Sequence, residues 1–238
     1  PALPPQRQRH LAWLLLVLPD RALHLHGIGP GFYAPLARLL GFTLISTHHA
    51  LDYERPKWGL LGRTFLKCGE YMLAKFSNQI ICVSDVVRST LSVRHKSASG
   101  KSVTIRNGAP PPPETLPEPD QVLEQLGLTQ RPYVLAVGRL DSTKGFDVLI
   151  EAFTSSQIAE THTLAIAGAG QRGDPYVSKL ERMGQGNVKF IGMQPASTIR
   201  RLYESTALFV HPSHLEGFPL VVMEALGAGA PIVLSNIG

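Results

Sequence analysis

The chain has 238 residues, of which 44% are hydrophobic and 17% charged, so it can bury a substantial core and is not a disordered tail. The 23 Lys and Arg residues against 18 Asp and Glu give a net charge of +5. This excess suits anionic ligands or an anionic membrane surface, but it is spread along the chain, which argues against a nucleic-acid-binding protein. At roughly 150 residues per domain, the length corresponds to about 1.6 domains.

The longest apolar run, Leu11 to Leu18, is far shorter than the roughly 20 residues that cross a membrane. It lacks a small-residue cleavage site, so a signal peptide is not expected. Cys68 and Cys82 stand among apolar residues. We predict that both are buried free thiols, which is typical of a reducing compartment and therefore of a cytoplasmic protein.

The N-terminal half alternates short apolar runs with segments of helical spacing. Strands are predicted at 22–26, 42–47, 79–83 and 103–105, and helices at 33–40, 58–76 and 84–94. A Pro-rich stretch then runs from 108 to 119. Because proline cannot donate to a strand ladder or continue a helix, we expect this stretch to be a semi-rigid connector.

The C-terminal half alternates more regularly. Strands are predicted at 133–137, 163–167, 188–191, 207–211 and 232–234, and helices at 146–153, 175–183, 196–204 and 220–226. Such alternation indicates βαβ units and parallel sheets covered by helices on both faces. We therefore expect an α/β fold of two Rossmann-like lobes, residues 1–108 and 120–238 with a linker at 109–119, and an active site in the cleft between them.

The first candidate site is Gly138-Arg-Leu-Asp-Ser-Thr-Lys-Gly145, where a predicted strand gives way to a helix. Open α/β sheets bind ligands at such junctions. Gly138 and Gly145 free the backbone, while Arg139 and Lys144 add two positive charges beside the amide donors of a helix N-terminus. These features predict a diphosphate site. The Walker spacing is absent, and a solvated surface loop is the plain alternative.

The second candidate is Glu216-Gly-Phe-Pro-Leu-Val-Val-Met-Glu224. Pro219 is well placed as the first helical residue, so Glu216 belongs to the loop before the helix and Glu224 to the helix itself. We expect Glu216 to point into the cleft and Glu224 to face sideways, which suits two separate hydroxyl-binding roles. The plain alternatives are a charge at a helix N-terminus and an exposed helix position.

Together, Gly-Arg-Leu-x4-Lys-Gly and the later Glu-Gly-Phe-Pro-x4-Glu-Ala resemble the donor lobe of the family 4 retaining glycosyltransferases, which have the GT-B fold. The resemblance implies that Arg139 and Lys144 hold the donor diphosphate and stabilise the leaving nucleotide. It also implies that Glu216 contacts the donor sugar and that Glu224 binds the ribose hydroxyls. The remaining donor-binding residues lie in the same motifs: Gly138, Gly145, Gly217, Phe218 and Pro219.

The N-terminal half carries a further resemblance. The segments His24-Leu-His-Gly-Ile-Gly-Pro30 and Thr47-His-His-Ala-Leu-Asp-Tyr53 end two predicted strands. They resemble bacterial family members that build rhamnose- or hexose-containing surface polysaccharides. By position, His49 reaches the donor sugar or the acceptor, although Ala50 stands where this pattern usually has Gly. The acceptor-side residues implied by the same resemblance are His26, Gly27, Ser84 and Arg88.

Two alternatives concern these N-terminal residues. His24 and His26 alternate along a strand near His48 and His49, so a zinc site is a rival hypothesis, although no carboxylate or cysteine stands at ligand spacing. A packed or solvated His24 is the plainer one. Residues 58–76 carry basic side chains, which are typical either of an amphipathic helix at a membrane surface or of a core helix with a solvated face.

The predicted reaction transfers a hexosyl group from a nucleotide diphosphate sugar to a saccharide or lipid-linked acceptor, with retention of anomeric configuration. The resemblance implies a front-face displacement without a metal or another cofactor, in agreement with the absence of any Asp-x-Asp run. Peripheral association with the inner face of the cytoplasmic membrane would bring the enzyme to lipid-linked acceptors. The alternatives are a nucleotide-sugar epimerase of the same architecture and a non-catalytic nucleotide-sugar-binding protein.

The length also suggests a two-lobe enzyme with both ends missing. The N-terminal lobe shows four predicted strands and no early Gly-rich loop, and the chain ends soon after the strand at 232–234. We expect this segment to carry the donor motifs but to have little or no activity alone.

Overall fold

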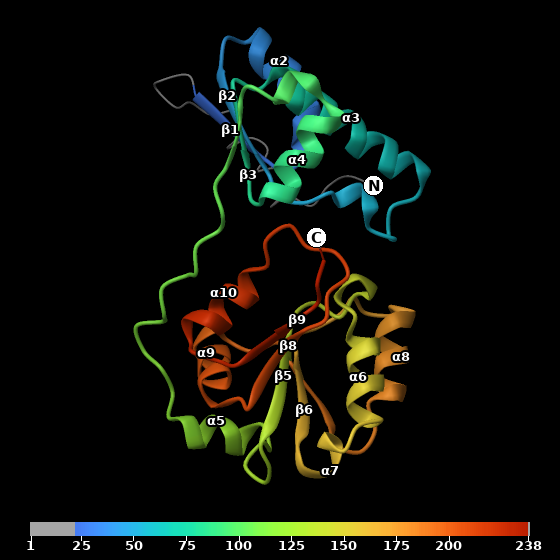
Figure 1. Ribbon diagram of the computed structural model, residues 1–238, viewed down its shortest axis with the longest axis vertical. Helices are drawn as coiled ribbons and strands as arrows, with labels where there is room; N and C mark the ends of the chain where they lie inside the picture. The colour runs from blue at the N-terminus through green and yellow to red at the C-terminus, as the bar shows by residue number, and fades with distance from the viewer. Residues whose placement is uncertain (1–21, 238) are drawn as a thin grey trace. The chain divides into compact units, whose positions relative to one another are not determined.

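The computed structural model describes residues 22–237, which form two compact units that divide between Arg106 and Asn107 (Figure 1). Each unit is built on one parallel sheet with helices packed against it. The predicted α/β class, with two Rossmann-like folds, is therefore confirmed. The apolar run at 11–18 lies outside the described residues.

The first unit holds a four-stranded parallel sheet in the order β1-β2-β3-β4. Its strands are β1 (Ala22–His26), β2 (Thr43–His48), β3 (Gln79–Cys82) and β4 (Ser102–Thr104). The connecting helices are η1 (Pro30–Tyr33), α2 (Ala34–Leu39), η2 (Asp52–Glu54), α3 (Leu60–Phe76), α4 (Asp85–Arg94) and η3 (Lys96–Ala98). Because the register pairs His26 with Thr47, the loops that follow β1 and β2 start side by side.

Helix α3 packs closely on this unit. Leu73 is fully buried in a core that also contains Ile80 of β3 and Leu91 of α4. At Gly69, an added Cβ would overlap the carbonyl oxygen of Ile28, which lies in the loop after β1. Glycine at this position therefore lets the helix backbone touch the loop backbone.

The second unit holds a five-stranded parallel sheet in the order β7-β6-β5-β8-β9. Its strands are β5 (Tyr133–Val137), β6 (Thr163–Ala167), β7 (Val188–Gly192), β8 (Leu208–His211) and β9 (Ile232–Leu234). Its helices are α5 (Pro119–Gln125), η4 (Ser142–Lys144), α6 (Phe146–Thr154), α7 (Ile158–Thr161), α8 (Pro175–Met183), α9 (Ala196–Ser205) and α10 (Leu220–Gly227). The strand order reverses between β5 and β8, and sheets of this kind bind ligands at that switch point.

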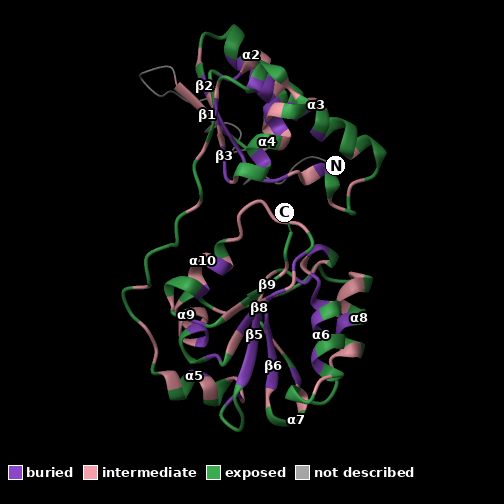
Figure 2. Cartoon of the chain, viewed as in Figure 1, coloured by how far each residue is buried: buried purple, intermediate pink, exposed green. Residues whose placement is uncertain are grey.

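Alternate residues of β5 pack against opposite layers of helices. Leu135 belongs to a core with Leu202 of α9 and Val222 of α10, whereas Val134 belongs to a core with Phe146 of α6. Strands β5 and β6 are buried along nearly their whole length (Figure 2). Burial on both faces explains why these strands are continuous apolar runs in the sequence.

The predicted elements agree with the observed ones to within one or two residues at their ends. The sequence pattern misses α5 and α7. Helix α7 has only 4 residues, too few to show a helical period. Helix α5 begins at Pro119, a favoured first residue of a helix. Pro219, expected as the first residue of α10, is instead its N-cap.

The Pro-rich stretch contains no helix or strand before Pro119. It packs against the second unit, because Arg201 Nε donates to the carbonyl of Pro117 at 2.8 Å. At its start, Asn107 Nδ2 donates to the carbonyl of Phe218 at 3.1 Å. The Pro-rich stretch therefore contacts α9 of the second unit. Domain boundaries at 108 and 120 remain a prediction.

The two cysteines differ in burial. Cys82 of β3 is buried and Cys68 of α3 is partly buried, and both are free thiols. Burial raises the pKa of the Cys82 thiol to about 11. Within residues 22–237, none of the helices has both the length and the apolar character needed to cross a membrane.

Replacing Gly69 with alanine should lower the free energy of unfolding by about 1–3 kcal/mol, because the new Cβ would push α3 away from the loop after β1. Urea denaturation measures the change. Gly100→Ala is the matched control, since a Cβ there meets open space. Equal losses in the two variants would contradict the close contact.

Candidate functional site

Two glycines define the ligand-binding edge of the second sheet. Gly168, just after β6, has a φ of 145°, and a Cβ there would overlap the carbonyl oxygen of Gly138. A Cβ on Gly138 itself would make an ordinary contact with Phe146 at 3.5 Å. The expectation that glycine at 138 frees the backbone is therefore wrong. The backbones of residues 138 and 168 approach each other closely because residue 168 is glycine.

Backbone contacts join the two sequence motifs. The carbonyl of Thr143 accepts hydrogen bonds from the His214 amide at 2.8 Å and from Ser213 Oγ at 3.0 Å. Gly145 has a φ of 65°, and a Cβ there would overlap the carbonyl oxygen of Pro212. The loop after β5 and the loop after β8 therefore lie directly against each other, as the switch-point geometry predicts.

Lys144 and Glu216 meet at this contact. Lys144 Nζ donates to Glu216 Oε1, and His211 Nε2 lies 2.9 Å from the same oxygen. The Lys144 and Glu216 side chains are only 15% and 12% exposed. Burial alone would raise the pKa of Glu216. The hydrogen bonds from His211 and Lys144 and the charge of Lys144 outweigh this effect and lower the pKa to about 2. Glu216 is therefore a carboxylate at neutral pH.

Arg139, the second predicted phosphate ligand, has different surroundings. Its Nη2 lies 3.2 Å from Asp141 Oδ2, and its side chain is 64% exposed. A mostly exposed ion pair is weak and easily exchanged. The site thus combines one lysine held by a buried carboxylate with one arginine that extends into solvent.

Glu224 of α10 lines a cavity in the second unit. The Tyr203 hydroxyl donates to Glu224 Oε2 at 3.4 Å, and both line a cavity of about 360 Å³ together with residues 109–113. A second cavity of about 200 Å³ is lined by Arg139 and Gly168. Three residues line both cavities: Val137, Gln194 and Ile199. A continuous surface therefore leads from the end of β5 to Glu224.

In the first unit, the predicted histidines gather at the ends of β1 and β2. His26 Nδ1 lies 3.2 Å from His49 Nε2, and His24 Nε2 lies 2.8 Å from Thr47 Oγ1. Gly27 has a φ of 86°, and its amide donates to the Thr47 carbonyl at 2.8 Å. Burial and the charges of neighbouring histidines lower the pKa of His49. The 3.2 Å contact between the His26 and His49 rings is short enough for one shared hydrogen bond.

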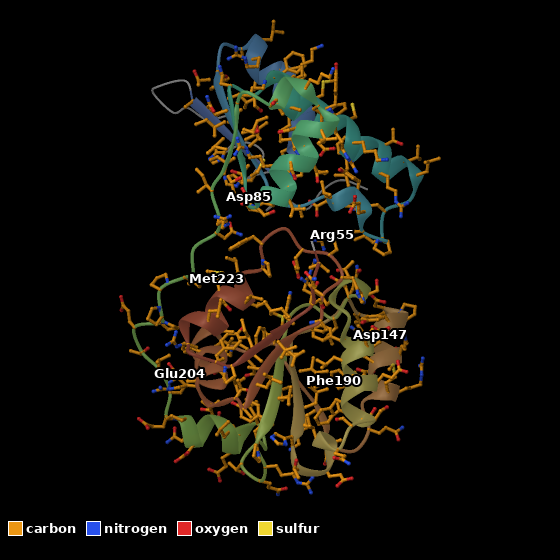
Figure 3. The ribbon with its side chains drawn as sticks, in the orientation of Figure 1. Arg55, Asp85, Asp147, Phe190, Glu204 and Met223 are labelled. Atoms are coloured by element: carbon orange, nitrogen blue, oxygen red, sulfur yellow. The ribbon has the colours of Figure 1, made fainter. Side chains whose placement is uncertain are left out.

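Ser84 and Arg88 lie at the start of α4. The Ser84 hydroxyl accepts a hydrogen bond from the Val87 amide at 3.2 Å and so caps the helix. Asp85, labelled in Figure 3, accepts a hydrogen bond from Thr104 Oγ1 at 2.7 Å. Arg88 is exposed. Ser84 thus has a structural role, and Arg88 is the more accessible of the two predicted acceptor-side residues.

The described part of the chain contains no set of ligands that would support the zinc hypothesis. Across residues 22–237, no group of three or more His, Cys, Asp or Glu side chains is placed to hold a metal ion. The His24 and His26 rings instead pack against each other, with centroids 4.2 Å apart and planes tilted by 34°.

Four site residues escape the motif analysis: Gly168, Tyr203, His211 and Ser213. His211 carries a detectable signal, because it ends an apolar strand at the edge where α/β sheets bind ligands. Gly168 follows the apolar strand β6 at the same edge, whereas Tyr203 and Ser213 carry no such signal, since their roles arise from contacts with residues far away in the sequence.

Comparison with known proteins adds independent information. Residues 120–238 match the family described as glycosyl transferases group 1, and residues 2–111 match Glycosyltransferase Family 4. The chain is 26% identical over 244 residues to O-antigen chain mannosyltransferase B of Escherichia coli, a match that covers 98% of this chain and 61% of that protein. It is 31% identical over 225 residues to the GDP-mannose-dependent alpha-(1-6)-phosphatidylinositol monomannoside mannosyltransferase of Mycolicibacterium smegmatis, covering 86% and 55%.

Solved structures show the same architecture. HepE of Anabaena, in complex with UDP and glucose, matches with a TM-score of 0.75 at 22% identity, covering 92% of this chain and 60% of that one. Sucrose-phosphate synthase of Thermosynechococcus elongatus matches with a TM-score of 0.73 at 21% identity, covering 92% and 56%. The two sheets are thus those of the GT-B fold.

The chain belongs to the group 1 glycosyltransferases, that is, to glycosyltransferase family 4, as its two motifs predict. It spans 61% and 55% of the lengths of the two mannosyltransferases that it resembles.

Glu216 should make stability sensitive to acid. Its folded pKa of about 2 lies below the ordinary value of 4.5, so the unfolded chain binds more protons between these values, and stability falls as the pH drops through that range. Denaturation at several pH values should show a smaller decline in Glu216→Gln. The control Glu160→Gln changes an exposed carboxyl on α7 and should decline like the parent. Identical declines in all three proteins would contradict this prediction.

Proposed function

We propose that the protein is a retaining glycosyltransferase that moves a hexosyl group from a nucleotide diphosphate sugar to a saccharide or lipid-linked saccharide. The observation that carries this proposal is the Lys144–Glu216–His211 cluster, which lies at the switch point of the second sheet. Two mannosyltransferases among the relatives, and the UDP and glucose bound by HepE, support a nucleotide-sugar donor.

The nucleoside occupies the connected cavities of the second unit. Their volumes, about 360 and 200 Å³, suit a ligand of that size. Glu224 accepts hydrogen bonds from the ribose hydroxyls, and the Tyr203 hydroxyl holds the carboxylate in place. A carboxylate that lines a cavity and already accepts one hydrogen bond has further lone pairs for a diol.

The diphosphate binds where the loops after β5 and β8 meet. Lys144 is a fixed positive charge there, and the exposed Arg139 exchanges its partner Asp141 for phosphate oxygens. Glu216 accepts hydrogen bonds from sugar hydroxyls while His211 and Lys144 keep it charged and oriented. Backbone amides near Gly217 and Phe218, ahead of α10, add donors for the phosphates.

Charge stabilisation at the leaving group drives the reaction. As the bond between the anomeric carbon and the phosphate oxygen breaks, negative charge grows on the diphosphate beside Lys144 and Arg139. The acceptor hydroxyl attacks the anomeric carbon from the same face and gives its proton to the departing phosphate oxygen. The products are the glycoside, with retained configuration, and the protonated nucleoside diphosphate.

The first unit supplies the acceptor side of this proposal. His49 contacts the donor sugar or the acceptor, and His26, Gly27 and Arg88 complete the surface that receives the acceptor. The His26–His49 contact of 3.2 Å supports a shared role for these two side chains. Ser84 contributes through the helix start that it caps.

Lys144→Ala should lower kcat/KM for transfer about 100-fold or more, because one aligned charge on the leaving group is lost. A thermal-shift screen of UDP-, GDP-, dTDP- and ADP-sugars first identifies the donor, and release of the nucleoside diphosphate then measures transfer. The control is Lys179→Ala on α8, an exposed lysine paired with Asp147, which is labelled in Figure 3. Transfer by Lys144→Ala at the parent rate would refute the proposal.

The same assay separates the two alternatives. Incubation with the nucleotide sugar alone should return it unchanged, and the appearance of a 2-epimer would favour the epimerase. A glycan product left unchanged by Lys144→Ala and Glu216→Ala would favour a non-catalytic sugar-nucleotide-binding protein.

The outer side of α3 supports membrane association. Leu60 and Leu61 are 81% and 87% exposed in its first turn, and exposed Phe65 stacks on Phe32 of η1 with centroids 5.1 Å apart. Exposed Arg63 and Lys67 and the nearby Lys57 add positive charge. Exposed apolar side chains can enter the membrane interface, and the basic side chains beside them are attracted to anionic lipids. A lipid-linked acceptor lies in the same membrane. We therefore include binding at the inner face of the cytoplasmic membrane in the proposal.

Replacing both Leu60 and Leu61 with serine should weaken binding to vesicles of phosphatidylglycerol and phosphatidylcholine about tenfold, because their burial in the interface is lost. Sedimentation with vesicles measures binding, which should also fall with salt and with omission of phosphatidylglycerol. Val93→Ser removes a side chain that is 83% exposed on α4 and should have no effect. Failure of the parent protein to bind these vesicles would contradict this part of the proposal.

A further inference from the structure

A buried polar network lies in the first unit beside the loop that carries His49. Its centre is Glu70 of α3, which is 1% exposed. Glu70 Oε1 accepts hydrogen bonds from His48 Nε2 at 3.1 Å and from the Tyr53 hydroxyl at 3.3 Å. His48 ends β2 and Tyr53 lies in η2, so one carboxylate holds both ends of the segment 48–53.

The C-terminal end of α4 lies beside this centre. Arg94 Nη1 donates to the Tyr53 hydroxyl, and the guanidinium lies over the Tyr53 ring, 5.0 Å from its centroid. Arg94 Nη2 is also 3.6 Å from Glu54 Oε1. His95, which follows the helix, has its Nε2 3.6 Å from Glu70 Oε2. Arg94 thus supplies positive charge near the buried carboxylate.

Glu70 also determines which ring nitrogen of His48 carries the proton. A carboxylate only accepts, so His48 Nε2 donates. His48 Nδ1 is buried and has no hydrogen-bond partner among residues 22–237, so a proton there would be an unsatisfied buried donor. Burial raises the pKa of Glu70, but the hydrogen bond from His48 and the surrounding positive charges bring it below its ordinary value. The charged carboxylate therefore holds the proton of His48 on Nε2.

The neighbouring residue of α3 fixes the other half of the histidine pair. Gly69 touches the carbonyl of Ile28, two residues after His26. His26 Nδ1 and His49 Nε2 are 3.2 Å apart. Consecutive residues of one helix, Gly69 and Glu70, thus hold the loops that bring these two imidazoles together.

We propose that Glu70 is the positioning residue for His49: its carboxylate fixes the segment 48–53 through His48 and Tyr53 and thereby sets the His26–His49 contact. The catalytic consequence rests on the proposed function, because it assumes that His49 meets the sugar or the acceptor. The geometry of the histidine pair does not depend on that function. A network that only stabilises the core is the competing explanation.

Glu70→Gln keeps the shape of the side chain but removes its charge and points an amide donor toward one of its two partners. Long-range ¹H–¹⁵N NMR of the imidazole rings should show that His48 loses its single Nε2–H tautomer and that the His49 signals shift. Tyr53→Phe keeps the carboxylate, so the His49 signals should shift while the His48 tautomer persists. The control Ser102→Ala removes a buried hydroxyl of β4 that has no hydrogen-bond partner within residues 22–237, and it should alter neither ring.

In the transfer assay, Glu70→Gln should lower kcat about tenfold and leave KM for the nucleotide sugar within about twofold, as expected for a misplaced group on the acceptor side. A purely stabilising network would lower the melting temperature without moving the His49 signals or kcat. Unchanged His49 signals in folded Glu70→Gln would overturn the proposal, and Tyr53→Phe decides alone if Glu70→Gln does not fold. The NMR result decides the role of Glu70 independently of transfer, so a failure of the proposed function and a failure of this proposal can be told apart.

Discussion

The contact between the loops after β5 and β8 is the constraint on which the second unit's site depends. Gly145 adopts a left-handed conformation against the carbonyl of Pro212, and a side chain at that position would separate the loops. Their backbones are further joined at Thr143, whose carbonyl accepts from two residues of the other loop. Lys144 and Glu216 are therefore neighbours because of backbone packing, and their attraction adds to an arrangement that already exists.

The Lys144–Glu216 pair stabilises this contact, and in the proposed function its lysine also binds the diphosphate. Removing Lys144 and Glu216 from water costs free energy, which their hydrogen bond and the one from His211 offset. In the proposed reaction, a diphosphate beside Lys144 is a second anion for the same ammonium group. The lysine would then divide its hydrogen bonds between carboxylate and phosphate, and His211 would keep Glu216 from becoming an unpaired buried charge.

The fold could be predicted from the sequence to a large extent, because strands buried on both faces are short apolar runs and helices show the 3.6-residue period. The donor motifs were equally visible, since Gly145, Lys144 and Glu216 stand in fixed patterns. Contacts between distant segments could not be predicted from the sequence pattern. Glycine is needed at 168 because the carbonyl of Gly138 lies against it, and Glu70 has its role because His48 of β2 donates to it. Helix α7 was missed because 4 residues cannot display a period.

The connector has a chemical consequence for ligand selection. Pro110 to Pro113 form part of the wall of the larger cavity. Four consecutive prolines offer carbonyl oxygens but no backbone N–H, and their fixed φ angles leave little room for rearrangement. This part of the wall is therefore rigid and has no backbone N–H. An acceptor atom of any ligand that faces residues 110–113 meets no backbone donor there.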